Sequence, residues 1–170
     1  MTKVDANLSR GQAASATVPI LSTALINVTW DSSPDLEQFL GFMTAYTKGR
    51  FSASLAERVT LASTELLDNA VRYGSLARDF SYRLNADNSK VAVCVRNTTV
   101  RARIEMLTAQ LRRLEVSAEQ VYASELERSM VQAGGRRSML GLARIRHEAE
   151  MHLDLEVEGV QVSVFAYCAR

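Results

Sequence analysis

The amino-acid sequence predicts an α/β (α+β) two-layer sandwich, in which helices cover one face of a mixed, mostly antiparallel sheet. Short runs rich in β-branched and apolar residues alternate with longer segments whose apolar residues recur at helical spacing. These segments follow the order β-α-α-β-β-α-α-α-β-β, which is typical of helices layered on one sheet. The 170 residues suffice for a single domain with a buried core.

The N-terminal part is expected to contain a tail, a strand and a helix. Residues 1–17 are small and polar and predict a loose tail before one domain over residues 18–170. Residues 21–30 are rich in apolar and β-branched side chains and predict the first strand. The Asp-Ser-Ser-Pro segment that follows can begin a helix, and apolar residues recur at helical spacing over 36–46.

A longer second helix and a hairpin come next. Ser52 or Ser54 can cap the helix, its apolar positions form one stripe, and Gly74 supplies a stop. Residues 80–84 and 91–95 then predict two antiparallel strands around a turn of Asp, Asn and Ser.

The C-terminal half predicts three helices and a final hairpin. Amphipathic patterns indicate helices over 102–114, 118–130 and 140–150, with a Gly-Gly-Arg-Arg break before the third. Strands are expected over 153–157 and 160–167, around a Glu-Gly turn.

Composition narrows the class of protein. Apolar residues make up 47% and charged residues 23%, and the net charge is +1 with both signs interspersed. We therefore expect no nucleic-acid or membrane partner. Cys94 and Cys168 are expected to be buried, reduced thiols. The start lacks the apolar stretch of a signal peptide and no run reaches the length of a membrane span, so a cytoplasmic location is expected.

The second helix carries a notable polar cluster. Glu65 and Asn69 are four residues apart and therefore share one helix face, while Asp68 and Arg72 form a second such pair. An Asn oxygen is a hard ligand suited to Mg²⁺, and a carboxylate one turn earlier can act as a general base. The alternative is a solvated helix face with an Asp68–Arg72 ion pair.

The segment L-A-S-T-E-L-L-D-N-A-V-R-Y-G over residues 61–74 resembles the N-box helix of the GHKL superfamily, which includes histidine kinases, Hsp90, gyrase B and MutL. It is most similar to the subgroup of anti-sigma-factor serine kinases. The resemblance implies a Bergerat-type ATP-binding fold, with Glu65 as general base and Asn69 as Mg²⁺ ligand. ATP and Mg²⁺ are the implied cofactors, and Asp68 and Arg72 lie beside them as candidate cofactor-binding residues.

The first glycine box of the family is altered. The family places an Asp after the central strand to hold the adenine amino group, whereas Asn97 stands there in this chain and no glycine follows. An Asn oxygen can accept the same hydrogen bond without charge assistance, at about half the strength. Asn97 and Thr99 are therefore candidate adenine contacts, and the open alternative is that they cap the next helix.

The second glycine box is altered as well. The family has Gly-x-Gly-Leu-Gly-Leu at the start of a helix that holds phosphates. Gly141 and Leu142 match its last positions, but Met139 replaces a glycine. Arg136, in the upstream Gly-Gly-Arg-Arg segment, is a candidate phosphate contact, with an ordinary exposed loop as the alternative.

Two functions remain. The favoured one is a bacterial regulatory protein that controls a protein partner by docking, with weak or conditional ATP binding; the resemblance suggests a STAS-domain anti-anti-sigma factor or a sigma factor as partner. The alternative is an active ATP/Mg-dependent serine/threonine kinase. The charged helical segment 101–132 is either a solvated face or a partner surface. A homodimer through residues 21–30 and a monomer are both open, as is a plain globular domain with a chance motif.

Overall fold

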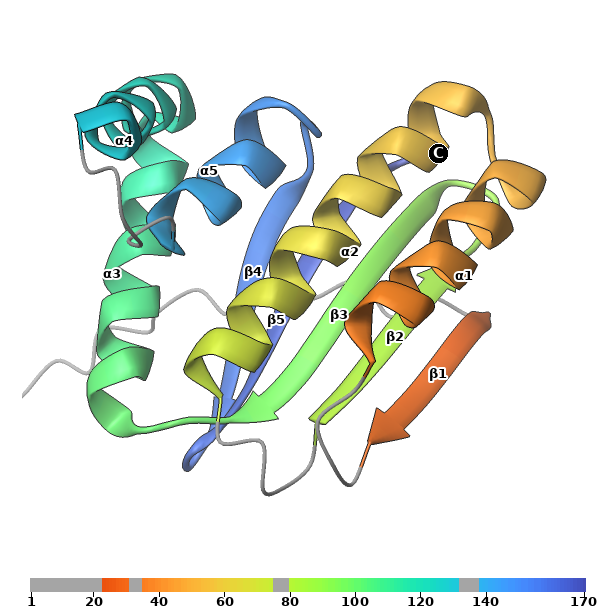
Figure 1. Cartoon of the computed structure of the whole chain (residues 1–170), viewed down its shortest axis with the longest axis horizontal. Coiled ribbons are helices and arrows are strands. Elements are labelled where there is room, and N and C mark those ends of the chain that lie inside the picture. The colour runs from red at the N-terminus through yellow and green to blue at the C-terminus, as the bar shows by residue number, and fades with distance from the viewer. Residues whose placement is uncertain (1–22, 31–34, 75–79, 132–137) are drawn as a thin grey trace, which may run out of the picture.

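A computed structural model describes residues 23–30, 35–74, 80–131 and 138–170. Within them the chain forms five strands and five helices (Figure 1). In chain order these are β1 (Ala24–Trp30), α1 (Leu36–Arg50), α2 (Ala53–Tyr73), β2 (Phe80–Ala86), β3 (Lys90–Thr98), α3 (Arg101–Val116), α4 (Ala118–Val131), α5 (Ser138–His147), β4 (His152–Glu158) and β5 (Gln161–Ala169). The order is the predicted one. The predicted tail over residues 1–17 and the Gly-Gly-Arg-Arg segment with Arg136 lie outside the described residues.

The five strands form one open sheet in the order β1-β2-β3-β5-β4. All four strand pairings are antiparallel, so in the described chain the sheet is wholly rather than mostly antiparallel. The β2–β3 hairpin turns at Asp87, whose carboxylate accepts hydrogen bonds from the backbone N–H groups of Ser89 and Lys90. β3 lies at the centre and pairs along its whole length with β5.

Figure 1 shows α1, α2 and α5 over one face of the sheet, with α3 and α4 standing beside it. The apolar stripe of α2, which includes Val59, Ala62 and Leu66, packs with Tyr82 and Leu84 of β2 into the core. These side chains are almost fully shielded from solvent. The predicted two-layer α/β sandwich is therefore confirmed.

Both ends of α2 are set by residues that the sequence marks. The Ser52 hydroxyl accepts a hydrogen bond from the backbone N–H of Leu55, which caps the start of the helix. Gly74 caps the end, and its N–H donates to the Ala70 carbonyl. A Cβ at Gly74 would collide with that carbonyl and with the Asn97 side chain of β3. Only glycine therefore lets α2 end this close to the sheet.

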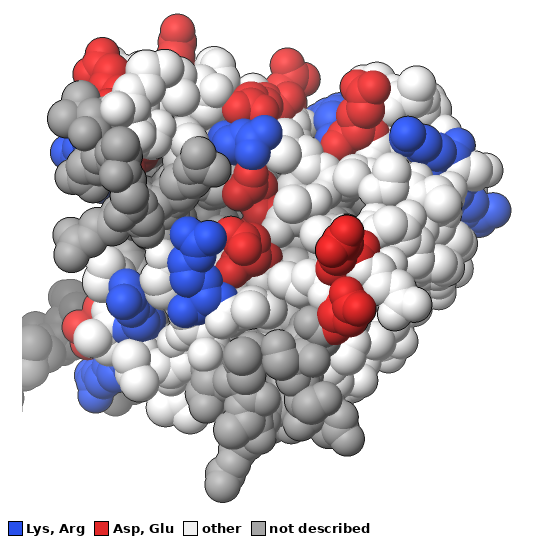
Figure 2. All heavy atoms as spheres, viewed as in Figure 1, with Lys and Arg blue, Asp and Glu red and all other residues white. Residues whose placement is uncertain are grey.

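Charged side chains lie on the surface, and the two cysteines are buried. Figure 2 shows acidic and basic side chains interspersed on the face that carries the helices. Cys94 and Cys168 are buried free thiols, and burial raises the pKa of Cys94 to about 11. Among the helices the structure describes, none has the length and apolar composition needed to cross a membrane.

Candidate functional site

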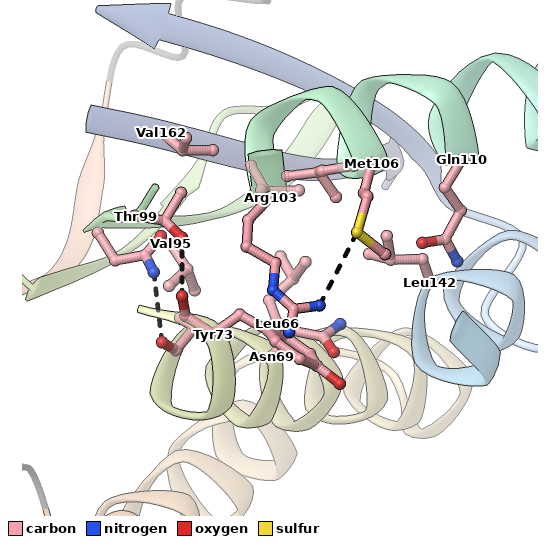
Figure 3. A pocket seen from close by; sticks show the side chains of 14 residues that line it. Leu66, Asn69, Tyr73, Val95, Thr99, Arg103, Met106, Gln110, Leu142 and Val162 are labelled. Carbon is pink, nitrogen blue, oxygen red and sulfur yellow. Dashed lines mark hydrogen bonds between the residues drawn. The ribbon is translucent and has the colours of Figure 1, made fainter. Parts of the chain in front are cut away.

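A pocket of about 90 Å³ opens between α2, α3, α5 and the inner face of β3 and β5 (Figure 3). Most of its lining is apolar. It is formed by Leu66, Asn69, Ala70, Tyr73, Val95, Asn97, Thr99, Arg103, Met106, Leu107, Gln110, Leu142, Val162 and Val164. Four candidate residues from the sequence, Asn69, Asn97, Thr99 and Leu142, thus meet at one place although α2, β3 and α5 are distant in sequence.

Helix α5 approaches the polar face of α2 very closely. A Cβ at Gly141 would lie 2.5 Å from Oε2 of Glu65 and 3.4 Å from Nδ2 of Asn69. The glycine therefore leaves the space that these two side chains occupy. The Nδ2 atom of Asn69 is buried and has no hydrogen-bond partner among the described residues. A buried amide donor without a partner is costly, and so this atom is available to a ligand.

Glu65 is held by a basic residue of α5. The Arg144 guanidinium forms an ion pair with the Glu65 carboxylate, whose side chain is 15% exposed. Burial raises the pKa of Glu65, although Arg144 acts in the opposite direction. The Glu65 carboxylate is therefore paired with Arg144, a cation of the same chain.

Arg144 is fixed in turn by a second carboxylate. It donates to both oxygens of Glu148 at 3.0 and 3.1 Å, and the hydroxyl of Tyr122 on α4 donates to the same carboxylate at 2.8 Å. The hydrogen bond from Arg144 is the main cause that lowers the pKa of Glu148. A continuous polar network thus links α4 through α5 to Glu65 on α2. Sequence reasoning missed Arg144, because only its helical spacing to Glu148 marks it before the fold is known.

Asn97 lies within β3 rather than on the predicted loop, because the strand continues to Thr98 in register with β5. Its Nδ2 donates to the Ala70 carbonyl at 3.3 Å, and the Thr99 hydroxyl donates to the Tyr73 carbonyl at 2.7 Å. Both side chains therefore satisfy carbonyl groups at the C-terminus of α2. The alternative that they cap α3 is wrong, since the N-cap of α3 is Val100 and no side chain caps it.

The other candidates lie apart from the pocket. Asp68 and Arg72 are exposed and form an ion pair with each other at 3.0 Å, which is the alternative stated for the spacing. Neither belongs to the pocket lining. Arg136 and the side chain of Met139 fall outside the part of the chain that the structure describes.

Helix α3 contributes side chains that the sequence did not mark as site residues. Figure 3 shows Arg103 and Met106 reaching from α3 toward Tyr73 and Asn69 on α2. The Arg103 guanidinium lies 4.7 Å from the centroid of the Tyr73 ring, a cation–π arrangement. The amphipathic pattern of α3 predicts an apolar stripe but not which helix it faces, so this wall of the pocket could not be located from sequence.

The residues present fit Mg·ATP only in part. An apolar pocket with Asn97 and Thr99 at one end suits a small ring, but no carboxylate is among its lining to hold an adenine amino group. On the phosphate side, the unpartnered Asn69 amide can offer its oxygen to a cation, whereas the Glu65 carboxylate is already neutralised by Arg144. This arrangement does not fit a magnesium-assisted phosphoryl transfer with Glu65 as the base.

No protein-family model and no curated protein sequence matches this chain. Among solved structures, a chain of the SiaB-SiaC complex from Pseudomonas aeruginosa is similar, with a TM-score of 0.61 and 15% sequence identity. The similarity covers 86% of this chain and 91% of that chain. At this identity the likeness establishes a shared fold.

Proposed function

We propose that this chain is a bacterial regulatory domain that controls a protein partner by docking, with weak or conditional ATP binding. The observation that carries this proposal is the Glu65–Arg144 ion pair. A general base must have a free carboxylate close to the attacking hydroxyl. Here the carboxylate faces a guanidinium that two further side chains hold in place. The site is built to keep Glu65 paired rather than to release it for catalysis.

The docking part of the proposal is supported by the likeness to a chain solved in a two-protein complex. It is also supported by the shape of the fold, in which α3 and α4 stand beside the sheet (Figure 1). Large apolar side chains at their ends are exposed, Val116 by 87% and Met130 by 73%. Contiguous exposed apolar patches are typical of surfaces that a partner covers, and these two side chains are the proposed apolar contacts of such a surface. A STAS-domain protein or a sigma factor is the partner that the sequence resemblance suggests.

Docking is tested with the purified chain and a STAS-domain protein of the same organism. Size-exclusion chromatography with light scattering, with and without Mg·ATP, should show a complex at micromolar concentration. Val116→Asp should weaken this complex because it places a charge at the proposed contact, while Val157→Asp on β4, which is also exposed, should not. If neither a STAS-domain protein nor a sigma factor forms a complex with the chain, the docking proposal is contradicted.

The alternative, an active serine/threonine kinase, is favoured by the close approach of Gly141 to both Glu65 and Asn69. Calorimetric titration with Mg·ATP separates the two functions. The regulatory proposal expects binding in the millimolar range and no phosphate transfer to the partner. Micromolar binding that Asn69→Ala abolishes, together with phosphorylation of the partner that Glu65→Gln abolishes, would establish the kinase.

A further inference from the structure

The charge of the pocket lining is unbalanced. Of the fourteen lining residues, Arg103 alone carries a charge, and the rest are apolar or neutral. None of the ion pairs among the described residues includes Arg103. Among the described residues its guanidinium lies over the Tyr73 ring, and its Nη1 atom donates to the Met106 sulfur at 3.9 Å, a weak acceptor. The pocket therefore combines an apolar interior with one exposed cation at its rim, which no described carboxylate pairs with.

A second donor lies opposite this cation on α2. Asn69 lines the pocket, and its buried Nδ2 atom has no hydrogen-bond partner among the described residues. Figure 3 shows the Arg103 side chain pointing from α3 toward Asn69 and Tyr73. Two helices thus present donors to the same space, and no acidic residue is among the pocket lining, although the Glu65 carboxylate lies beside Asn69 at Gly141. Ligand pockets commonly pair an apolar lining with a few such polar groups that fix orientation.

We propose that this pocket binds a small planar organic acid, with its ring among the apolar side chains and its carboxylate on Arg103. The Asn69 amide would donate to the same carboxylate. The enclosed volume of about 90 Å³ is smaller than a dry cavity of about 150 Å³ that holds benzene, so the ligand would have no more than one ring and part of that ring would lie in the open mouth of the pocket. The proposal goes beyond the proposed function, because it concerns a ligand of this pocket that needs neither a partner protein nor a nucleotide.

Phenylacetate and phenylacetamide provide a matched pair of probes, since they share one ring and differ in charge. We would titrate each into the ¹⁵N-labelled chain and follow backbone amide shifts by NMR. Phenylacetate should shift amides around Tyr73, Arg103 and Leu142, with a dissociation constant at least about tenfold lower than that of phenylacetamide, as a charge-assisted hydrogen bond requires. Equal affinity for the two probes, or shifts away from these residues, would overturn the proposal.

Three variants assign the effect to the guanidinium. Arg103→Met keeps the length of the side chain and should remove the preference for phenylacetate, and Arg103→Lys should retain most of it. Arg101→Met is the matched control, because Arg101 is an exposed arginine on the same helix that does not line the pocket and pairs with Glu105. Circular dichroism checks that each variant is folded. A preference that survives in folded Arg103→Met, or is lost in Arg101→Met, would contradict the assignment to Arg103.

Discussion

The Glu65–Arg144 pair can be weighed by a double-mutant cycle with Glu65→Gln and Arg144→Met. The two side chains are 15% and 36% exposed, so the pair is neither a surface nor a buried ion pair. Exposed pairs contribute ~0.2–1 kcal/mol. Removing one partner of a fully buried pair costs ~3–5 kcal/mol. The structure places the coupling between these limits, at about 1–2 kcal/mol after allowance for solvent screening at Arg144.

The two single variants should differ in size. Glu65→Gln removes a carboxylate that burial penalises, so its cost should be small. Arg144→Met leaves that carboxylate half-buried without its cation and also removes the two hydrogen bonds to Glu148, so it should cost more. For a chain of this length, about 1–2 kcal/mol corresponds to a fall in Tm of about 2–8 °C. Glu148→Gln is the control that isolates the loss at Glu148.

The pKa shifts of Glu65 and Glu148 predict how the stability difference between wild type and Arg144→Met changes with pH. The folded-state pKa of Glu65 is raised above its ordinary 4.5, so its ionisation costs stability as pH rises from about 4.5 through the folded pKa. The pKa of Glu148 is lowered, so its contribution is present above about 4.5 and is lost as pH falls through the folded pKa. Arg144→Met raises the pKa of Glu65 further and weakens the effect at Glu148. The stability gap between wild type and variant should therefore widen from pH 5 to pH 7.

Urea unfolding followed by circular dichroism at several pH values measures all four corners of the cycle. A coupling below about 0.3 kcal/mol would show that the pair contributes no more than a surface contact. A gap between wild type and Arg144→Met that narrows as pH rises would show that Glu65 is not ionised beside Arg144. Either result would contradict the inference that the ion pair with Arg144 keeps Glu65 from acting as a general base.

Three further substitutions test how α2 is joined to the sheet, and a fourth, Gly41→Ala in α1, is the control for the first. Gly74→Ala should lower the free energy of unfolding by more than about 1 kcal/mol, because its Cβ collides with the last turn of α2 and with Asn97. Gly41→Ala, with open space in α1, should raise it by about 0.5–1 kcal/mol. Urea midpoints that fall in both variants, or in neither, would contradict this. Asn97→Asp should lose about 1–3 kcal/mol at pH 7 and less at pH 4, where the protonated acid can donate as the amide does; a larger loss at pH 4 would refute the hydrogen bond. Tyr82→Phe should cost about 1 kcal/mol in thermal unfolding, since its hydroxyl shares a buried hydrogen bond with a serine of α2, and no change would mean that this bond adds nothing.

The elements of the fold were predictable because each has a local signal. The stripe of α2, with Ser52 before it and Gly74 after it, fixes that helix almost to the residue. The end of β3 was missed because Asn97 has turn chemistry and low β propensity, and it outweighed the β-branched Thr98 that follows. Pairing with β5 outweighs that local preference, as Asn97 lies opposite Val162 and Thr98 opposite Gln161. Tertiary pairing of this kind leaves no mark in a single stretch of sequence.

The site was predictable only where its residues share one element. Spacing along α2 places Glu65 and Asn69 on one face, and the structure keeps them together beside Gly141. Spacing also places Asp68 and Arg72 near them, yet these two point to solvent as an ion pair. Arg144 lies 79 residues from Glu65, and no periodicity relates positions that distant. Its role depends on how α5 packs on α2, which only the fold determines.

Gly141 and Arg144 stand three residues apart on α5 and therefore face α2 together. Gly141 removes the side chain that would exclude the Glu65 carboxylate, and Arg144 supplies the charge that neutralises it. A helix that serves a phosphate instead turns free backbone N–H groups toward the ligand. In this chain the face of α5 that contacts α2 binds the Glu65 carboxylate through Arg144. The hydrogen bonds of Glu148 to Arg144 and Tyr122 extend this contact to α4. If the proposed partner docks on α4, it would contact one end of a network whose other end is the Glu65–Arg144 ion pair.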